Sequence, residues 1–83
     1  MTRTEVFEKM NRIFRDNFDD ESIVLTDSTS AEDIEDWDSL EQINLVVAIQ
    51  DEFRVKFNIQ EVNAMQNVGE MVDDILKKTG AVQ

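Results

Sequence analysis

The sequence predicts an all-α protein, a four-helix bundle with three main helices, one short third helix and a long first loop. Two observations support this fold class. Apolar residues recur at helical spacing in several segments of the 83-residue chain. A capping signature, in which Thr, Asp or Asn is followed three residues later by Glu, precedes each of those segments. The signature occurs at Thr2/Glu5, Asp38/Glu41, Asn58/Glu61 and Asn67/Glu70.

The first two helices follow the first two signatures. An apolar stripe predicts the first helix over about residues 3–18, and its members are Val6, Phe7, Met10, Ile13, Phe14 and Phe18. The second helix is predicted to begin at Ser39 and to end near Arg54. Because residues 45–49 are apolar nearly all round, we expect this helix to be the central and most buried one.

The last two helices are shorter, and a long loop separates the first from the second. The third is predicted over residues 59–64 and the fourth over residues 68–78, where five apolar residues face inward: Val68, Met71, Val72, Ile75 and Leu76. The first loop spans roughly nineteen residues, which is long for a compact domain. We expect its apolar residues to pin it to the bundle; these are Ile23, Val24, Leu25, Ile34 and Trp37.

The composition excludes several classes of function. A chain of this length forms a single domain, residues 1–83, with a small core. It has no cysteine and no histidine, so disulfides, thiolate metal sites and Ser-His-Asp or Cys-His catalysis are impossible, and we expect no enzyme. The N-terminus lacks the apolar core of a signal peptide, and the longest apolar run, residues 45–49, is too short to span a bilayer. We therefore expect a cytoplasmic protein.

Charge is distributed unevenly along the chain. The net charge is −11, and residues 16–53 contain 13 Asp or Glu residues without a single Lys or Arg. Such a field repels nucleic acid and anionic membranes and attracts basic protein surfaces. The acidic block is either a solvated face or a docking surface for basic partners, and composition alone leaves both open.

Ser39 is the strongest candidate site. It falls at the first position of the predicted second helix, directly after the Asp38 cap, where its hydroxyl points outward near unsatisfied N–H groups and the positive end of the helix dipole. That environment suits a phosphate ester. Leu40 offers an apolar contact for whatever follows the phosphate. The same three residues are also compatible with an ordinary helix start.

In this context the sequence resembles the acyl carrier protein family, which includes the peptidyl carriers. The stretch over residues 36–41, Asp-Trp-Asp-Ser-Leu-Glu, is similar to the attachment motif of that family. Residues 45–53 are similar to the rest of its second helix, and residues 67–75 to the start of its last helix. The resemblance extends from Asp36 to about Leu76 and is looser over the first helix and loop.

The resemblance implies a covalent cofactor. A phosphopantetheinyl transferase would attach 4′-phosphopantetheine from coenzyme A to Ser39, and the terminal thiol would carry acyl groups as thioesters. The absence of cysteine fits this reading, because the working thiol then comes only from the cofactor. Asp38 stands at the aspartate position of the motif and is implied to help bind Mg²⁺ during the transfer, a role compatible with capping. No resident metal is expected.

The resemblance also implies a docking surface on the second helix. Glu41, Asp51 and Glu52 supply its acids, which would meet basic surfaces of the transferase and of acyl-transferring or synthase enzymes. We expect the chain to act as a monomer. Several positions depart from members devoted to fatty-acid synthesis and favour a carrier for a specialised pathway; they are Trp37, Asn44, Gln50 and Phe57-Asn58.

An acyl chain on the arm would have to lie among apolar side chains of the second and third helices. The candidate lining residues are Ile43, Val47, Val62 and Met65. The same apolar spacing is also what an ordinary core requires. Trp37 is either an anchor for the loop or a contact for the arm.

Other readings of the sequence differ in function class. A non-covalent acidic adaptor predicts an unmodified Ser39 and a partner whose binding is sensitive to salt. Within the carrier class, the cargo is a fatty acyl, polyketide, amino-acyl or other acyl group. Calcium sensing is disfavoured because the acids at residues 19, 20, 21 and 27 lack the spacing and central glycine of a calcium-binding loop. A hydrolase using Ser39 lacks a histidine to activate it.

Overall fold

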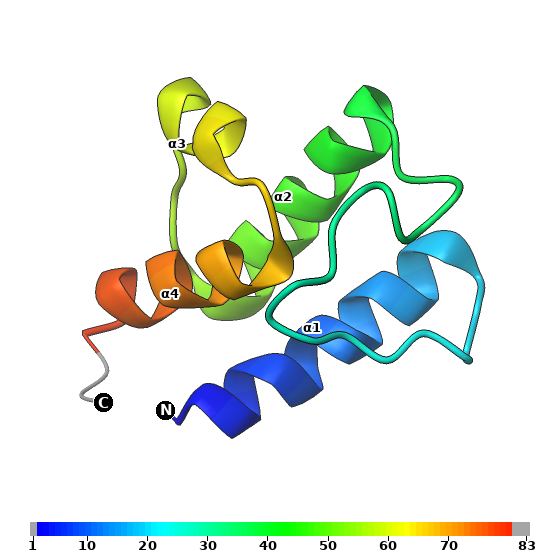
Figure 1. The fold of residues 1–83 in the computed structure, drawn as a ribbon. Coiled ribbons are helices and arrows are strands. Elements are labelled where there is room, and N and C mark those ends of the chain that lie inside the picture. The colour runs from blue at the N-terminus through cyan, green and yellow to red at the C-terminus, as the bar shows by residue number, and fades with distance from the viewer. Residues whose placement is uncertain (1, 81–83) are drawn as a thin grey trace.

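The computed structural model describes residues 2–80 and contains, within them, four helices and no strand. In chain order the helices are α1 (Arg3–Phe18), α2 (Ser39–Phe53), α3 (Ile59–Ala64) and α4 (Val68–Lys78) (Figure 1). The predicted all-α fold is confirmed, and so are the predicted helix positions. The second helix ends at Phe53, because Arg54 adopts a left-handed backbone conformation with φ of 56°.

All four predicted N-caps form, but only two of them are complete capping boxes. Thr2 and Asn58 each accept from the backbone N–H three residues on, and the glutamate at that position accepts in return from the cap N–H. Asp38 and Asn67 accept from the corresponding backbone N–H groups at 2.9 Å, but the glutamates three residues on do not accept from the cap N–H in return.

The glutamate of the second signature bonds elsewhere because α1 lies beside it. The Glu41 carboxylate accepts from the side-chain amides of Asn17 on α1 and of Asn44 one turn along α2, each at 3.1 Å. In the fourth signature, Glu70 accepts from the backbone N–H of Gln66 at 2.7 Å. The predicted capping boxes at Asp38 and Asn67 are therefore half formed.

The core lies between α1, α2 and α4. Val6, Met10 and Phe14 of α1 are fully buried, and α4 contributes six buried residues along its 11-residue length. The inward-facing residues predicted for the last helix are all among them. Short helix α3 has no buried residue and lies on the far side of α2 and α4 from α1 (Figure 1). An open cleft lies between α3 and α2.

The expectation that the second helix is the most buried is wrong. α2 buries only Leu45, Val46, Ile49 and Phe53 of its 15 residues. The remaining large apolar residues point outward: Leu40 is 66% exposed, Ile43 58% and Val47 51%. A helix at the edge of a three-helix core buries one face only, so an apolar surplus on α2 faces solvent and the cleft.

The first loop, residues 19–38, is held to the bundle by both side chains and backbone. Leu25 and Trp37 are buried, while Ile23 and Ile34 pack partly buried against the core, as predicted. Val24 was expected to join them, but it is 70% exposed. The alternation has a simple cause, since an extended chain that packs Ile23 and Leu25 inward must turn the residue between them outward.

Backbone contacts join the same loop to the start of α4. The N–H groups of Val68 and Gly69 donate to the carbonyls of Thr29 at 2.8 Å and Asp27 at 3.0 Å. These donors belong to the first turn of α4 and have no partner within their own helix. Arg3 on α1 forms ion pairs with both Asp27 and Asp73, which ties α1, the loop and α4 together at one end of the bundle. Over residues 2–80, no helix has the length and apolar character needed to cross a membrane.

Candidate functional site

Ser39 is exposed and forms the first residue of α2. Asp38 precedes it in an extended conformation, and its carboxylate accepts from the Glu41 N–H, so the chain turns into the helix at this residue. Within the described part of the chain, the N–H groups of Ser39 and Leu40 donate to no protein acceptor. The opening turn of α2 therefore presents backbone donors and the positive end of its dipole beside the Ser39 hydroxyl.

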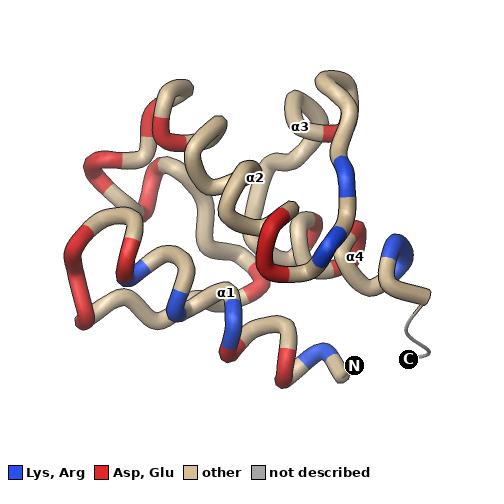
Figure 2. The backbone as a smooth tube through the Cα atoms, turned by 180° about the vertical axis from the view of Figure 1, so that it is seen from behind, with Lys and Arg blue, Asp and Glu red and all other residues tan. Residues whose placement is uncertain are grey.

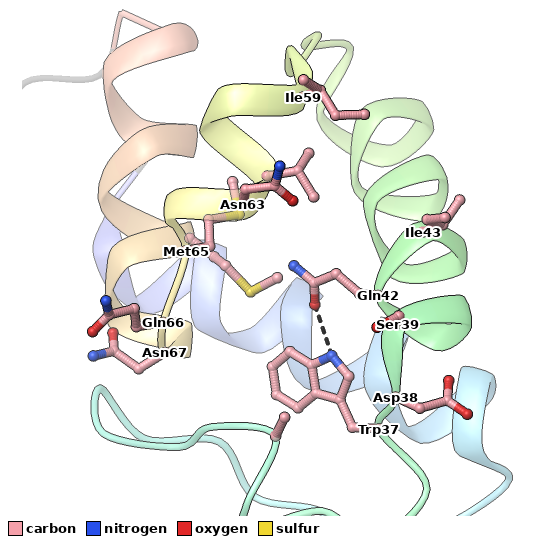
Figure 3. A pocket seen from close by; sticks show the side chains of 13 residues that line it. Trp37, Asp38, Ser39, Gln42, Ile43, Ile59, Asn63, Met65, Gln66 and Asn67 are labelled. Carbon is pink, nitrogen blue, oxygen red and sulfur yellow. Dashed lines mark hydrogen bonds between the residues drawn. The ribbon is translucent and has the colours of Figure 1, made fainter.

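An open cleft of about 470 Å³ begins at Ser39 and extends between α2 and α3 (Figure 3). Asp38 and Ser39 stand at one end of it. Three of the four residues predicted to contact an acyl chain lie along it, namely Ile43, Val62 and Met65. Val47 does not: it lies one turn beyond Ile43 on α2, outside the set of residues that line the cleft. Leu40 is also outside this set and is exposed beside the cleft.

Trp37 anchors the loop, as one of the two sequence alternatives predicts, and it also forms part of the cleft wall; contact with the arm stays a prediction. Its indole and the ring of Phe14 pack edge to face, with centroids 5.1 Å apart and planes at 78°. Its Nε1–H donates to Oε1 of Gln42 at 2.7 Å (Figure 3). Gln42 was missed in the sequence, because a single glutamine on a helix carries no signal of the residue it will meet.

Carboxamide side chains are a second feature of the cleft that the sequence did not reveal. Besides Gln42 on α2, three others line it from α3 and the segment that leads into α4: Asn63, Gln66 and Asn67 (Figure 3). They share the cleft with the apolar side chains of Ile43, Val62, Met65 and Met71. The cleft is therefore amphipathic, with polar groups on both of its walls.

The three acids predicted for docking differ in their surroundings. Asp51 is exposed on α2, and Figure 2 shows acidic residues along the neighbouring loop and the end of α1. Glu52 forms an ion pair with Lys9 of α1 at 3.3 Å. Glu41 is only partly exposed and is held by Asn17 and Asn44. Of these three acids, only Asp51 can therefore bind a partner without first breaking a contact within the described structure.

Two displaced pKa values belong to the face where α3 meets α4. The pKa of Glu61 is lowered, first by the hydrogen bond from Lys78, whose Nζ lies 2.8 Å from its carboxylate, and then by the backbone N–H of Asn58. The pKa of Asp74 is raised, first by burial and then by the nearby charge of Glu61. Both groups lie outside the cleft lining, so they concern the stability of this face.

The site offers a nucleophilic oxygen without the machinery to activate it. The chain contains no histidine or cysteine, and in the described range no three acidic side chains converge as metal ligands. An exposed serine hydroxyl at a helix N-terminus can accept a phosphoryl group from an enzyme that brings its own base. The arrangement therefore suits an attachment point.

No family model matches the sequence. The chain is 36% identical over 78 residues to an acyl carrier protein of Picosynechococcus sp., covering 93% of this chain and 95% of the relative. It is 34% identical over 79 residues to an acyl carrier protein of Petrotoga mobilis, covering 94% and 92%. The solution structure of holo acyl carrier protein from Geobacter metallireducens superposes with a TM-score of 0.85 at 43% identity, covering 90% of this chain and 86% of that one.

Proposed function

The chain belongs to the acyl carrier protein family, and we propose that Ser39 is the residue to which its 4′-phosphopantetheine arm is attached. It is a carrier and not an enzyme. The terminal thiol of the arm would hold acyl groups as thioesters and present them to partner enzymes. The observation that supports Ser39 is its position as an exposed hydroxyl at the N-terminus of α2, at the end of the cleft.

The residues around Ser39 fit the arm. Its phosphate would lie by the backbone N–H groups that open α2, where a helix N-terminus favours an anion. The exposed Leu40 and Ile43 on the same helix offer apolar surface to the pantoyl segment that follows the phosphate. In the attachment reaction, the Ser39 oxygen bonds to the phosphorus of the arm, and the pyrophosphate bond of coenzyme A breaks to release adenosine 3′,5′-bisphosphate. Because the chain has no histidine, the transferase must take the serine proton.

Asp38 has two compatible roles in this proposal. Its cap bond to the Glu41 N–H orients the first turn of α2, and its carboxylate is exposed next to Ser39. A carboxylate so placed can help hold Mg²⁺ in the complex with the transferase, because Mg²⁺ prefers oxygen ligands shared with phosphate. This metal would be part of the transfer complex rather than resident in the carrier.

Partner recognition would use the acidic side of α2 and the adjoining loop. The net charge of −11 attracts basic enzyme surfaces over a distance set by the ionic strength. We place Asp51 first among the docking residues, with Glu52 and Glu41 contributing once Lys9 and Asn17 release them. The neutral Asn44 and Gln50 leave this surface sparser in charge, which supports a carrier of a specialised fatty-acyl, polyketide or other acyl pathway. That the carrier acts as a monomer in the cytoplasm is a further part of the proposal.

The proposal is tested by the intact mass of the protein after incubation with coenzyme A, Mg²⁺ and a broad-specificity phosphopantetheinyl transferase. We expect a gain of one phosphopantetheine, which is absent in Ser39→Ala. Ser30→Ala, in the loop, is the matched control and should load as the wild type does. No gain by the wild type, under conditions that load a control carrier, would refute the attachment and favour an adaptor that works without a cofactor.

A further inference from the structure

On the side toward Phe14, the cleft is lined by Trp37 and Gln42, which are joined by a hydrogen bond. The indole is buried and is fixed from behind by the fully buried ring of Phe14. It is fixed at its edge by the 2.7 Å bond to Gln42. An acyl chain that entered deeper than this pair would have to displace the indole from both contacts. In that direction the cleft therefore ends at Trp37, because the buried ring of Phe14 lies directly behind the indole.

The same bond sets the orientation of the Gln42 carboxamide. An indole N–H can only donate, so the oxygen of Gln42 must face Trp37 and its amino group must face away. Figure 3 shows that amino group directed toward the opposite wall of the cleft, where Asn63 and Met65 lie. Within the described residues, it donates to no protein acceptor. Gln42 thus presents N–H donors to the cleft, one helical turn from Ser39.

These donors make the cleft a poor place for a long alkyl chain. A saturated chain would cover the carboxamides of Gln42 and of the opposite wall without bonding to them, which costs free energy. An acyl group with a hydroxyl or carbonyl oxygen near its thioester would accept from them, while its few carbons contact Ile43, Val62 and Met65. The end of the arm must share the same space, because the cleft begins at Ser39.

We propose that the cleft holds a short, oxygen-bearing acyl group, and that the Trp37–Gln42 pair excludes long alkyl chains from it. This inference rests on the proposed attachment at Ser39. It assigns Gln42 as the residue that distinguishes oxygen-bearing from plain acyl groups, and Trp37 as the residue that limits depth.

The test loads the full chain with butyryl, 3-hydroxybutyryl or dodecanoyl pantetheine arms, transferred from the corresponding acyl coenzyme A by a phosphopantetheinyl transferase. Protection of the thioester is measured as its rate of cleavage by hydroxylamine, relative to the free pantetheine thioester of the same acyl group. We expect 3-hydroxybutyryl to be protected about three- to tenfold more than butyryl, the factor that one net hydrogen bond supplies. Dodecanoyl should be protected no more than butyryl.

The emission of Trp37 is an independent readout, because it is the only tryptophan of the chain. Loading with 3-hydroxybutyryl should shift it relative to the form with an unacylated arm, since the acyl group then bonds to the amide that holds the indole. Dodecanoyl should leave it unchanged. A shift of the emission with dodecanoyl alone would overturn the proposal. The absence of a shift with all three acyl groups would overturn it as well.

Two variants separate the roles of the pair. Gln42→Leu should abolish the preference for 3-hydroxybutyryl over butyryl, whereas Gln60→Leu should retain it, because Gln60 is exposed on α3 outside the cleft lining. Trp37→Leu should allow dodecanoyl to become protected. If that variant does not fold, the wild-type series and the Gln42→Leu comparison still decide.

The outcomes distinguish this inference from the one on which it rests. A wild-type chain that accepts none of the arms refutes the attachment at Ser39. If the protein loads all three arms but protects the thioester more as the alkyl chain lengthens, the attachment at Ser39 stands and the proposed selectivity is wrong. Equal protection of butyryl and 3-hydroxybutyryl in the wild type also overturns it.

Discussion

Gly69→Ala is expected to destabilise the protein even though alanine is the better helix former. The first turn of α4 passes so close to the loop that a Cβ at this position would lie 2.8 Å from the carbonyl oxygen of Asp27 and 3.2 Å from its Cα. Both atoms belong to the backbone, so the loop must move away. The movement acts on the hydrogen bonds that Val68 and Gly69 donate to the loop carbonyls.

Two opposing free-energy terms decide whether Gly69→Ala stabilises or destabilises the protein. Replacing glycine by alanine in a helix gains at most about 1 kcal/mol, and less in a first turn, where few helical bonds depend on it. A buried donor that loses its partner costs about 1–3 kcal/mol, and two such donors are at risk here. We therefore expect a net loss of about 1–3 kcal/mol. For a domain of this size that lowers the melting temperature by at least about 4 °C.

Thermal unfolding followed by circular dichroism, with urea unfolding as a second measure, tests the expectation. Lys77→Ala is the control, because Lys77 is exposed on the same helix and has no ion pair within 4.0 Å among the described residues; it should change stability by less than about 0.5 kcal/mol. A Gly69→Ala protein as stable as the wild type, or more so, would refute the reasoning. It would mean that the loop yields at no cost and that its carbonyls do not hold α4.

Three further predictions concern charge. Asp38→Ala should lose about 1 kcal/mol of stability through the missing cap and should also load phosphopantetheine slowly. Asp38→Asn should keep the cap and its stability but load as slowly, as urea unfolding and mass spectrometry will show. If Asp38→Asn loads as fast as the wild type, the charge of Asp38 has no role in loading. Asp74→Asn should stabilise the protein at pH 7, because the pKa of Asp74 is raised in the folded protein and its charged carboxylate is therefore less stable there than in the unfolded chain. The gain in stability should shrink as the pH falls through that raised pKa. A gain in the urea midpoint that stays constant across this pH range would contradict the prediction. Asp51→Lys should slow acyl transfer by a partner enzyme at low salt. Glu8→Lys is the control of equal charge change, because Glu8 is exposed on α1, outside α2 and the first loop. Equal slowing by both would show that recognition depends on net charge alone.

The helices could be predicted because their signals are local. The caps at Thr2, Asp38, Asn58 and Asn67 each act within one turn, and the apolar stripes of α1 and α4 fix which face is buried. The position of Ser39 likewise follows from its neighbours, because the Asp38 cap comes directly before it and apolar residues at helical spacing follow it. Local rules therefore predict the helices and the position of Ser39 at the start of α2.

What the sequence could not supply are contacts between segments far apart in the chain. Gly69 lies within the predicted fourth helix, and nothing in the sequence indicates that its missing side chain admits the Asp27 carbonyl. Glu41 fitted a capping box, yet Asn17 on another helix takes its carboxylate. Gln42 meets Trp37 only because the loop returns the indole beneath α2. Such pairings depend on how elements pack, which no periodicity records.

The cleft exists because α3 is joined to the bundle at its edge rather than packed into it. No residue of α3 is buried. Lys78 forms an ion pair with Glu61 at 2.8 Å and lies 5.1 Å from the ring centroid of Phe57, and the flanking Phe57 and Met65 pack partly buried against the core. Partly exposed ion pairs contribute little free energy, so α3 is attached more weakly than α1 or α4, whose buried faces supply the core. We therefore expect the wall on α3 to move more readily than the wall on α2. Such a movement would change the distance between α2 and α3, whereas Trp37 would stay in place, because Phe14 and Gln42 hold its indole.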